Sequence, residues 1–374
     1  MVEDAEFSQK FSVGIVGLGL IGGSIAKRLV TTGSCKVYAY NRHQTMYSEA
    51  RALGITCVES VADLARMQPN VLILCNSLAS MPEVLGEISR GINKQRTTLT
   101  DVGSVKGLVR EQVKAAGLGD CYIGAHPMAG SEFTGWQASS AELLDGALWA
   151  VSVDESSDFW RFLEVLRVIV ALCGNRVLVL NDSIHDASAA LISHMPHVVS
   201  TALANVLCEN ANRNVALQMS AGSWRDMTRV ALTDPNRTRA MVAENRRNVA
   251  DLLGSVIEEL SFAKKMLEES DGDLAAACDS AAACDERDVA ERAFFAKAGS
   301  WREYKYKERA VACDESPGDL RELRFALDCP GDWQSQLIQS AQSGEQIVGV
   351  ALSDLAAASD TRLARITLRR VSTL

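Results

Sequence analysis

One short stretch of this chain combines a histidine, small residues and a carboxylate in a pattern suited to chemistry. His126 follows the apolar, strand-like run 121–124, and the small-residue turn after it ends at Glu132. A histidine at the carboxyl end of a strand in an α/β sheet faces the crevice where ligands bind. Because an unperturbed imidazole has a pKa of about 6.5, it accepts protons near neutral pH. His126 is therefore the first candidate for a catalytic base.

A second stretch, residues 17–22, has the glycine spacing of a dinucleotide-binding turn. It follows a strand-like run and opens a helix-like run. The first glycine allows the tight turn, the second lets the backbone approach a pyrophosphate, and the third lets the helix pack on the sheet. The helix N-terminus would then bind the phosphates. The predicted cofactor residues are Gly17, Gly19, Leu20, Ile21 and Gly22.

The end of the second predicted strand bears on the choice between NAD and NADP. An NAD-binding chain usually has an acid here, because a carboxylate binds the ribose hydroxyls. This chain has Asn41, Arg42 and His43 instead. No carboxylate at position 41 repels a 2′-phosphate, and Arg42 is placed to bind one. We expect NADP to be favoured over NAD, although an asparagine also binds ribose hydroxyls and Arg42 has the alternative of pointing to solvent.

Three further stretches carry candidate substrate residues, each with a structural alternative. Ser104 ends a strand and starts a predicted helix over 104–116, where a serine is commonly an N-cap. Ser193, His194 and His197 lie in one helical run, where the two histidines share a face and have the alternative of being core residues. Arg225 and Arg229 follow in the next run, where paired surface charges are the alternative. No further ligand cluster has zinc spacing, so we expect no metal site.

The bulk composition limits the class of protein. With 374 residues, two or three domains are expected. A net charge of −9 argues against nonspecific nucleic-acid binding, which needs a basic face. The 10 cysteines form no CxxC pair, and neither a signal peptide nor an uncharged apolar run long enough to span a membrane is evident. We expect a reduced, cytoplasmic protein without a membrane span.

The order of elements predicts three parts. Residues 1–182 alternate between strand-like and helix-like runs, which predicts a Rossmann-like α/β dinucleotide-binding domain. Residues 183–290 form an all-α domain with helices over 184–210, 215–232 and 236–268. The first of these helices is apolar nearly all round, which predicts a dimer core. Residues 270–283 are expected to be a connector. The segment 300–374 has a βαββ order. The predicted strands of the first part are 12–17, 36–41, 71–76, 97–102, 122–125, 148–153 and 176–180.

Taken together and in order, these motifs resemble the prephenate/arogenate dehydrogenase family of tyrosine biosynthesis. The matching stretches are GLGLIGGS, DVGSVK, GAHPMAGSE, SHMPH and RDMTR followed by Asp234-Pro235, within residues 12–260. One departure is Thr238, near which the family often has an aromatic residue. Arg237 and Arg239 flank it and are expected to face solvent, with added positive potential at the pocket as the alternative. The C-terminal segment weakly resembles the start of an ACT domain, which implies a degenerate module and an amino-acid effector such as tyrosine.

The resemblance implies the reaction and the residue roles. Prephenate would give hydride to the nicotinamide while CO2 leaves and the ring becomes aromatic. His126 would accept the hydroxyl proton or hydrogen bond, and Ser104 would orient that hydroxyl and the nicotinamide. Ser193 and His197 would line the pocket, and Arg229 would bind a substrate carboxylate. Arogenate dehydrogenase is the close alternative. A non-catalytic NAD(P)-sensing protein is a distant one, because a sensor needs no proton acceptor.

Overall fold

The computed structural model describes residues 11–131, 133–271, 289, 291–311, 320–353 and 362–371. Its first layer is a five-stranded parallel sheet in the order β3-β2-β1-β4-β5. The strand order reverses between β1 and β4, and ligands bind at such a switch point. The strands are β1 (Ser12–Val16), β2 (Lys36–Tyr40), β3 (Thr56–Cys57), β4 (Val71–Leu74) and β5 (Thr98–Asp101).

Short helices connect and cover these strands, which confirms the predicted Rossmann-like fold. Apolar side chains of the strands and of the first helix form the core beneath them. The helices are α1 (Leu20–Thr32), α2 (Tyr47–Ala52), α3 (Val61–Arg66), α4 (Met81–Ser89) and α5 (Gly107–Ala115), with single turns η1 (Leu78–Ser80) and η2 (Gly119–Cys121). The helix predicted from Ser104 begins only at Gly107, because residues 102–106 form the turn that leaves β5.

A second sheet of six strands, β6-β7-β8-β10-β11-β9, continues from the first. A parallel bridge between Leu99 of β5 and Tyr122, just before β6, joins the two sheets. The carboxyl ends of β5 and β6 therefore lie at the same edge. β6 runs antiparallel to β7, and β7 parallel to β8. The elements are β6 (Gly124–Pro127), η3 (Trp136–Ala138), η4 (Ala141–Leu144), β7 (Leu148–Ser152), α6 (Phe159–Leu166), the π-helical η5 (Arg167–Leu172) and β8 (Arg176–Leu180).

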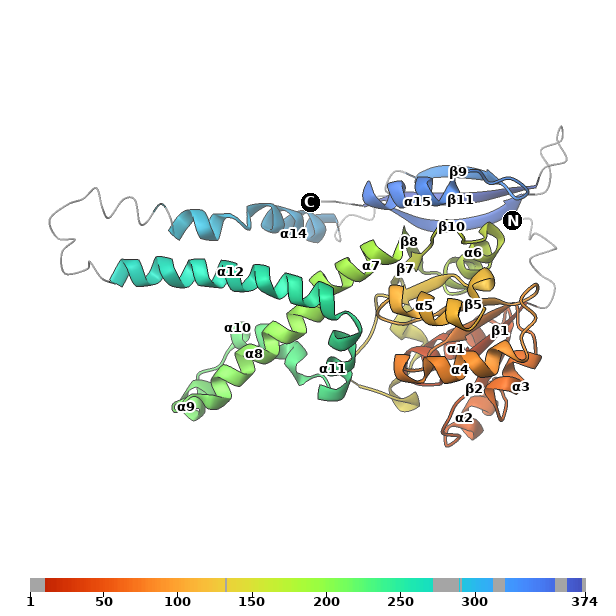
Figure 1. The fold of residues 1–374 in the computed structure, drawn as a ribbon, viewed down its shortest axis with the longest axis horizontal. Coiled ribbons are helices and arrows are strands. Elements are labelled where there is room, and N and C mark those ends of the chain that lie inside the picture. Colours follow the sequence, from red (N-terminus) through yellow and green to blue (C-terminus); the bar gives the residue numbers. More distant parts are fainter. Residues whose placement is uncertain are drawn as a thin grey trace.

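The C-terminal segment completes this second sheet and shares its core. It consists of β9 (Leu320–Ala326), α15 (Trp333–Gln342), β10 (Glu345–Ser353) and β11 (Leu363–Arg370). β11 lies between β9 and β10 and is antiparallel to both, as in a split βαβ unit. β10 pairs with β8, and Trp333 of α15 packs on Phe159 and Phe162 of α6. The expected small α+β segment is thus present as an extension of the nucleotide-binding part (Figure 1).

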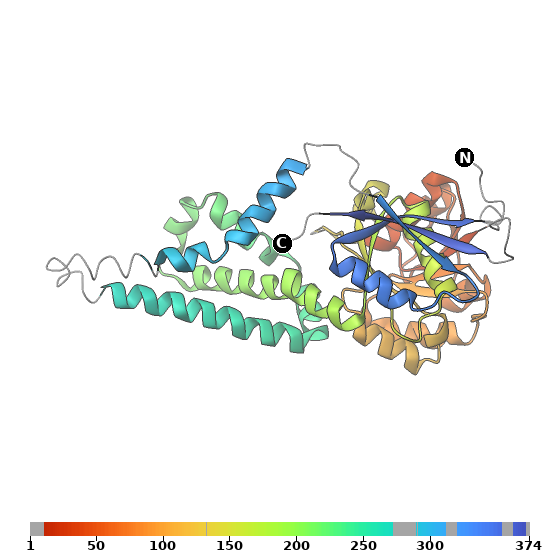
Figure 2. The same cartoon turned by 90° about the horizontal axis from the view of Figure 1, so that it is seen from above.

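The helical part projects from the sheets as an arm, which Figures 1 and 2 show from two sides. Its first helix is continuous through α7 (Asp182–Ala189), the π-helical η6 (Ala190–His194) and α8 (Met195–Glu209). The second and third predicted helices are each divided. The remaining elements are α9 (Arg213–Gln218), α10 (Gly222–Thr228), η7 (Arg229–Leu232), α11 (Pro235–Glu244), α12 (Arg246–Asp271) and α14 (Gly299–Val311).

The two breaks have different causes. Residues 219–221 leave the helix just before Gly222, and a glycine weakens a helix interior. At the second break, Asn245 separates α11 from α12 because its side-chain amide lies against the Asp186 carbonyl oxygen at 2.7 Å and His194 Nδ1 at 3.2 Å. The predicted connector at 270–283 lies outside the described residues apart from its first two positions.

The arm exposes large apolar side chains: Met219, which follows α9, is 78% exposed, and Leu232, at the end of η7, is 81% exposed. The continuous helix Asp182–Glu209 is long and apolar enough to cross a membrane by length and composition alone, which is weak evidence for a span. Monomers rarely expose large contiguous apolar surfaces without a partner. The arm therefore presents an interaction surface.

Candidate active site

The glycine turn between β1 and α1 fits a dinucleotide pyrophosphate. Gly17 has φ +101°, and a Cβ there would lie 2.8 Å from the Cys75 carbonyl oxygen. A Cβ at Gly22 would lie 1.9 Å from the Gly17 carbonyl oxygen, so the helix packs closely on the turn. Gly19 faces open space and caps α1 without a side-chain hydrogen bond. The first amides of α1 thus meet no side-chain cap and are oriented to bind an anion.

Asn41 holds this turn from the end of β2. Its Oδ1 accepts a hydrogen bond of 2.7 Å from the Leu18 amide, and its Nδ2 donates to the His43 carbonyl oxygen at 2.6 Å. Both ends of the Asn41 side chain are therefore engaged in shaping the loop. Arg42 and His43 are exposed beside it. On the β4 side, the buried Asn76 Oδ1 has no hydrogen-bond partner in the structure, and an orphaned buried acceptor is typical of a site that a ligand or water completes.

His126 lies in β6, at the sheet edge shared with the ends of β4 and β5. Its Nδ1 is 3.0 Å from Nε2 of His185 on α7, and the two rings meet edge to face. His185 Nδ1 is in turn 2.8 Å from Asp186 Oδ1. The three side chains form a hydrogen-bonded chain from a helical carboxylate to the strand-end imidazole.

With both rings neutral, the hydrogen bond to Asp186 assigns the nitrogen of each imidazole that carries the proton. Asp186 is an acceptor, so the Nδ1 of His185 donates to it. A neutral His185 then has an acceptor Nε2, to which His126 Nδ1 donates. The remaining nitrogen of His126, Nε2, is left unprotonated with a lone pair. That tautomer is the one a general base requires.

The electrostatic surroundings keep His126 neutral. Burial, followed by the positive charge of Lys106 and the neighbouring His185 and His194, lowers the pKa of His126 well below its ordinary value. Burial alone would raise the pKa of the Asp186 carboxyl, but hydrogen bonds from His185 and from the Lys106 and Gly107 amides outweigh it and lower that pKa. At neutral pH this hydrogen-bonded chain therefore links the charged Asp186 carboxylate, through His185, to the uncharged His126 imidazole.

A fully buried ion pair supports the backbone around His126. Lys106 donates to Asp101 and, at 2.7 Å, to the carbonyl oxygen of Ala125. The same carboxylate accepts 2.8 Å bonds from Tyr122 Oη and the Gly103 amide. Asp186 accepts hydrogen bonds from the Lys106 and Gly107 amides just before and at the start of α5, at 2.7 and 3.0 Å. We call this network of Asp101, Lys106 and Asp186 around His126 the polar junction. These bonds lock β5, β6, α5 and α7 to one another.

The candidate residues on the helical arm occupy two environments. His194 is buried, lies 3.2 Å from Asn245, and burial with the nearby His197 and His185 lowers its pKa to about 4, as expected of a core histidine. His197 is half-buried and donates from Nδ1 to the Ser193 carbonyl oxygen at 2.9 Å. Ser193 belongs to the π-helical turn η6, and such turns are frequent at functional sites.

Ser104 and the two predicted arginines, like Ser193 and His197, are not joined to the His126 cluster by a hydrogen bond in the described residues. Ser104 lies half-buried in the turn between β5 and α5. Arg229 begins η7 and is exposed, as is Arg225 on α10. In the described part of the chain, the hydrogen bond of the His126 ring goes to His185 rather than to either of them.

Sequence reasoning does not single out His185, Asp186 or Asn245, and it includes Lys106 only as the last residue of the DVGSVK stretch. A usable signal was the position of His185 and Asp186, directly after the last parallel strand. It also expected Arg237 to face solvent. Arg237 is exposed, but its Nη1 donates to the Ser131 carbonyl oxygen at 3.2 Å, across to the segment that follows His126. Glu132 lies outside the described residues.

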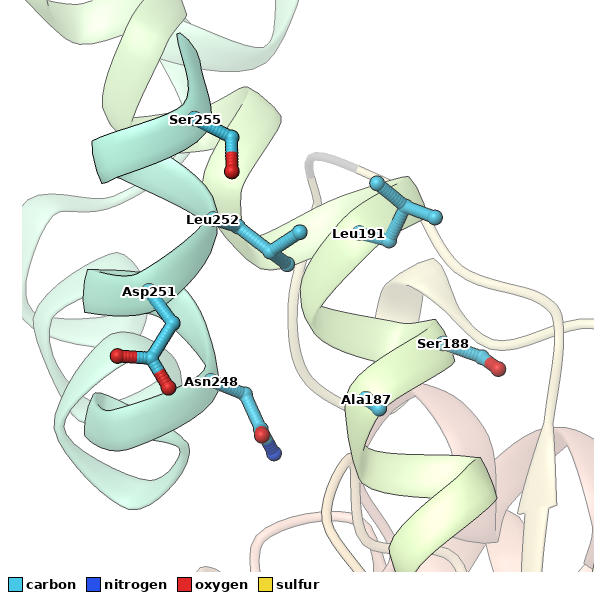
Figure 3. A pocket seen from close by; sticks show the side chains of 7 residues that line it. All are labelled: Ala187, Ser188, Leu191, Asn248, Asp251, Leu252 and Ser255. Carbon is cyan, nitrogen blue, oxygen red and sulfur yellow. The ribbon is translucent and has the colours of Figure 1, made fainter. Parts of the chain in front are cut away.

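A separate groove of about 410 Å³ lies between α7–η6 and α12. Figure 3 shows its side chains on the two facing helices. It holds none of the predicted site residues, and Leu191 on its wall is 52% exposed. Its lining comprises Ala187, Ser188, Leu191, Asn248, Asp251, Leu252 and Ser255.

Comparison with known proteins agrees with this architecture. Residues 25–179 match the family model of the prephenate dehydrogenase nucleotide-binding domain, and residues 181–277 match that of the prephenate dehydrogenase dimerization domain. The chain belongs to the prephenate dehydrogenase family. It is therefore an enzyme, an NAD(P)-dependent dehydrogenase of the prephenate/arogenate type.

Individual relatives extend the match along the chain. A cyclohexadienyl dehydrogenase of Zymomonas mobilis is 28% identical over 277 residues, covering 70% of this chain and 90% of the relative. The structure of A. aeolicus prephenate dehydrogenase in complex with hydroxyphenyl propionate and NAD+ has a TM-score of 0.67 at 27% identity, covering 81% of this chain and 99% of that one. A putative prephenate dehydrogenase of Corynebacterium glutamicum has a TM-score of 0.69 at 27% identity, covering 89% and 97%.

Proposed function

We propose that the chain catalyses the oxidative decarboxylation of prephenate to 4-hydroxyphenylpyruvate in tyrosine biosynthesis. The observation that carries the proposal is the Asp186–His185–His126 chain at the same sheet edge as the glycine turn. It supplies a neutral base beside a dinucleotide site, which oxidation of an alcohol requires. Arogenate, with an amine in place of the side-chain keto group, is the alternative substrate.

In this reaction the bound nicotinamide supplies the hydride acceptor. The protein residues hold the substrate and handle the proton. His126 Nε2 accepts the hydroxyl proton or hydrogen bond, and Ser104 orients that hydroxyl. Arg229 binds a substrate carboxylate, while Ser193 and His197 line the pocket from the arm. Because aromatisation drives the step, positioning of the reacting atoms is the main contribution of the protein.

For the cofactor, the proposal is NADP in preference to NAD. Gly17, Gly19 and Gly22 form the pyrophosphate turn, with the amides of Leu20 and Ile21. Asn41 carries no charge to repel a 2′-phosphate, and the exposed Arg42 offers a guanidinium whose fork matches a phosphate. The engagement of both ends of Asn41 within the loop leaves the recognition of that phosphate mainly to Arg42.

We also infer a homodimer formed through the arm, in line with the match of residues 181–277 to a dimerization domain. A second copy, rather than a membrane, would then cover the apolar helix Asp182–Glu209, in a cytoplasmic enzyme. The proposed partition is 1–182, 183–290 and 300–374, with α14 (Gly299–Val311) lying along the arm and β9–β11 extending the sheet of the first part. Tyrosine as an effector of the C-terminal βαββ segment remains a proposal that rests on the weak ACT resemblance.

The decisive experiment is an assay of the purified protein with prephenate and arogenate, each with NADP and with NAD. The proposal expects the highest kcat/KM with prephenate and NADP. A higher kcat/KM with arogenate than with prephenate would mean that arogenate is the substrate. A higher kcat/KM with NAD than with NADP would refute the role given to Arg42. Turnover of neither substrate would overturn the proposed reaction.

A further inference from the structure

The arm and the nucleotide-binding part contact each other at two places. At one, α7 continues directly from β8 and is bound through Asp182, His185 and Asp186 to the sheet domain. At the other, α11 reaches the segment 128–131 that follows β6. There the Arg237 guanidinium donates to the Ser131 carbonyl oxygen at 3.2 Å.

The contact is close enough to involve the preceding residue as well. An ideal Cβ at Gly130 would lie 3.9 Å from Arg237 Nη2, so the guanidinium rests against the Gly130–Ser131 peptide. Asp234 fixes the start of α11 by accepting the amides of Asn236 and Arg237, each at 3.0 Å. The base of the Arg237 side chain is thereby held in place while its tip reaches the segment 128–131 of the nucleotide-binding part.

The position of Arg237 is unfavourable for the helix itself. It is the third residue of α11, and the first turn contains no acidic residue. A cation near a helix N-terminus opposes the helix macrodipole, which favours negative charge there. The stability of α11 therefore gives no reason for an arginine at this position, whereas the hydrogen bond to the Ser131 carbonyl oxygen does.

We propose that Arg237 is a positioning residue that latches the segment 128–131 to α11 and so closes the crevice over the substrate. This inference rests on the proposed function, because the latch acts on the loop that directly follows the proposed base. Opening and closing of such contacts commonly governs substrate retention and product release. Arg237 stands in the run 236–239, where the resembled family often carries an aromatic residue.

The test compares Arg237→Met, Arg237→Lys and the matched control Arg239→Met, which removes an exposed arginine from the same helix. Loss of one exposed, charge-assisted hydrogen bond should raise KM for the substrate by about threefold to tenfold. The kcat should stay unchanged, or rise if opening limits product release. Arg237→Lys should be intermediate, and Arg239→Met should match the wild type.

A second readout does not depend on turnover. Amide hydrogen exchange over residues 128–131, with saturating NADP and again with saturating NAD, should be faster in Arg237→Met than in Arg239→Met. Equal exchange in the two variants, or equal KM, overturns the latch. If the wild type turns over neither prephenate nor arogenate, the proposed reaction fails, while the exchange comparison still decides the latch.

Discussion

The polar junction around His126 and the surface of the arm are built on opposite principles. At the junction, Asp101, Lys106 and Asp186 are buried or nearly so, and each charge meets several partners within the same chain. On the arm, apolar side chains such as Ile257 and Leu260 are 62% and 61% exposed. The charged side chains of the junction find their partners within one polypeptide, whereas the arm presents an apolar surface of the kind that a partner covers.

This difference separates two parts of the proposed chemistry. The base and its proton chain are assembled by β6 and α7 alone. The proposed carboxylate-binding residue, Arg229, lies exposed on η7, which packs on the helix α8 of the arm. Proton handling is therefore expected to depend on the packing of one chain, and anion binding on the state of the arm.

The largest expected effect comes from the proton side. His126→Asn should lower kcat by about 10²–10⁴-fold, the range found for general acid–base catalysis, with a much smaller effect on cofactor affinity. Asparagine retains a polar side chain but cannot accept and hold the proton. Steady-state kinetics and a cofactor titration measure the two quantities. Near-normal turnover would remove His126 from the mechanism.

The pH profile gives a control for the same residue. Because burial lowers the pKa of His126 well below 6.5, the unprotonated base is present throughout the neutral range. The acid limb of kcat/KM in the wild type should therefore lie below pH 6.5. The residual activity of His126→Asn should lack that limb. An acid limb at or above pH 6.5 would contradict the tautomer and charge assigned here.

Stability should respond strongly at the junction and weakly on the arm. Asp101→Asn leaves the fully buried Lys106 without its counter-charge, and breaking a buried pair in this way costs about 3–5 kcal/mol. Glu268→Gln breaks the exposed Lys264–Glu268 pair on α12 and should cost about 0.3–0.5 kcal/mol. Urea unfolding measures both. Similar shifts in the two variants would mean that the Lys106–Asp101 pair does not hold the junction together.

These contrasts also show what the sequence alone could reveal. The glycine turn and the strand positions were predictable, because Gly17, Gly22 and the alternating apolar runs act through local geometry. The partners of His126 were not, because His185 lies 59 residues away and reaches it only through the packing of α7. The break between α11 and α12 could not be predicted for the same reason. It depends on contacts of Asn245 with Asp186 and His194, which are distant in the sequence.

The exposed candidates call for a kinetic comparison on the arm. Arg229→Ala should raise the substrate KM by an amount corresponding to about 1.5–3 kcal/mol, the value of a hydrogen bond to a charged group. Arg225→Ala, one helical turn earlier and equally exposed, is the matched control and should change KM little. If the effects are reversed, Arg225 holds the carboxylate. If neither variant changes KM, another cation binds the substrate.

The smallest change tests whether a second copy covers the arm. Ile257, Leu260 and Leu267 are exposed on α12, and their spacing places them on one face of that helix. A charge buried in an apolar interface without a partner is costly, so Leu260→Glu should weaken the dimer. Ser261→Glu adds the same charge to the neighbouring, more polar position and should leave the dimer intact.

Sedimentation at micromolar concentration should give the dimer mass for the wild type and Ser261→Glu, and a shift toward monomer for Leu260→Glu. A wild-type monomer would refute the homodimer. A dimer unaffected by Leu260→Glu would place the interface on another face of the arm. The junction around His126 should remain folded in either variant, because its hydrogen bonds lie within one polypeptide.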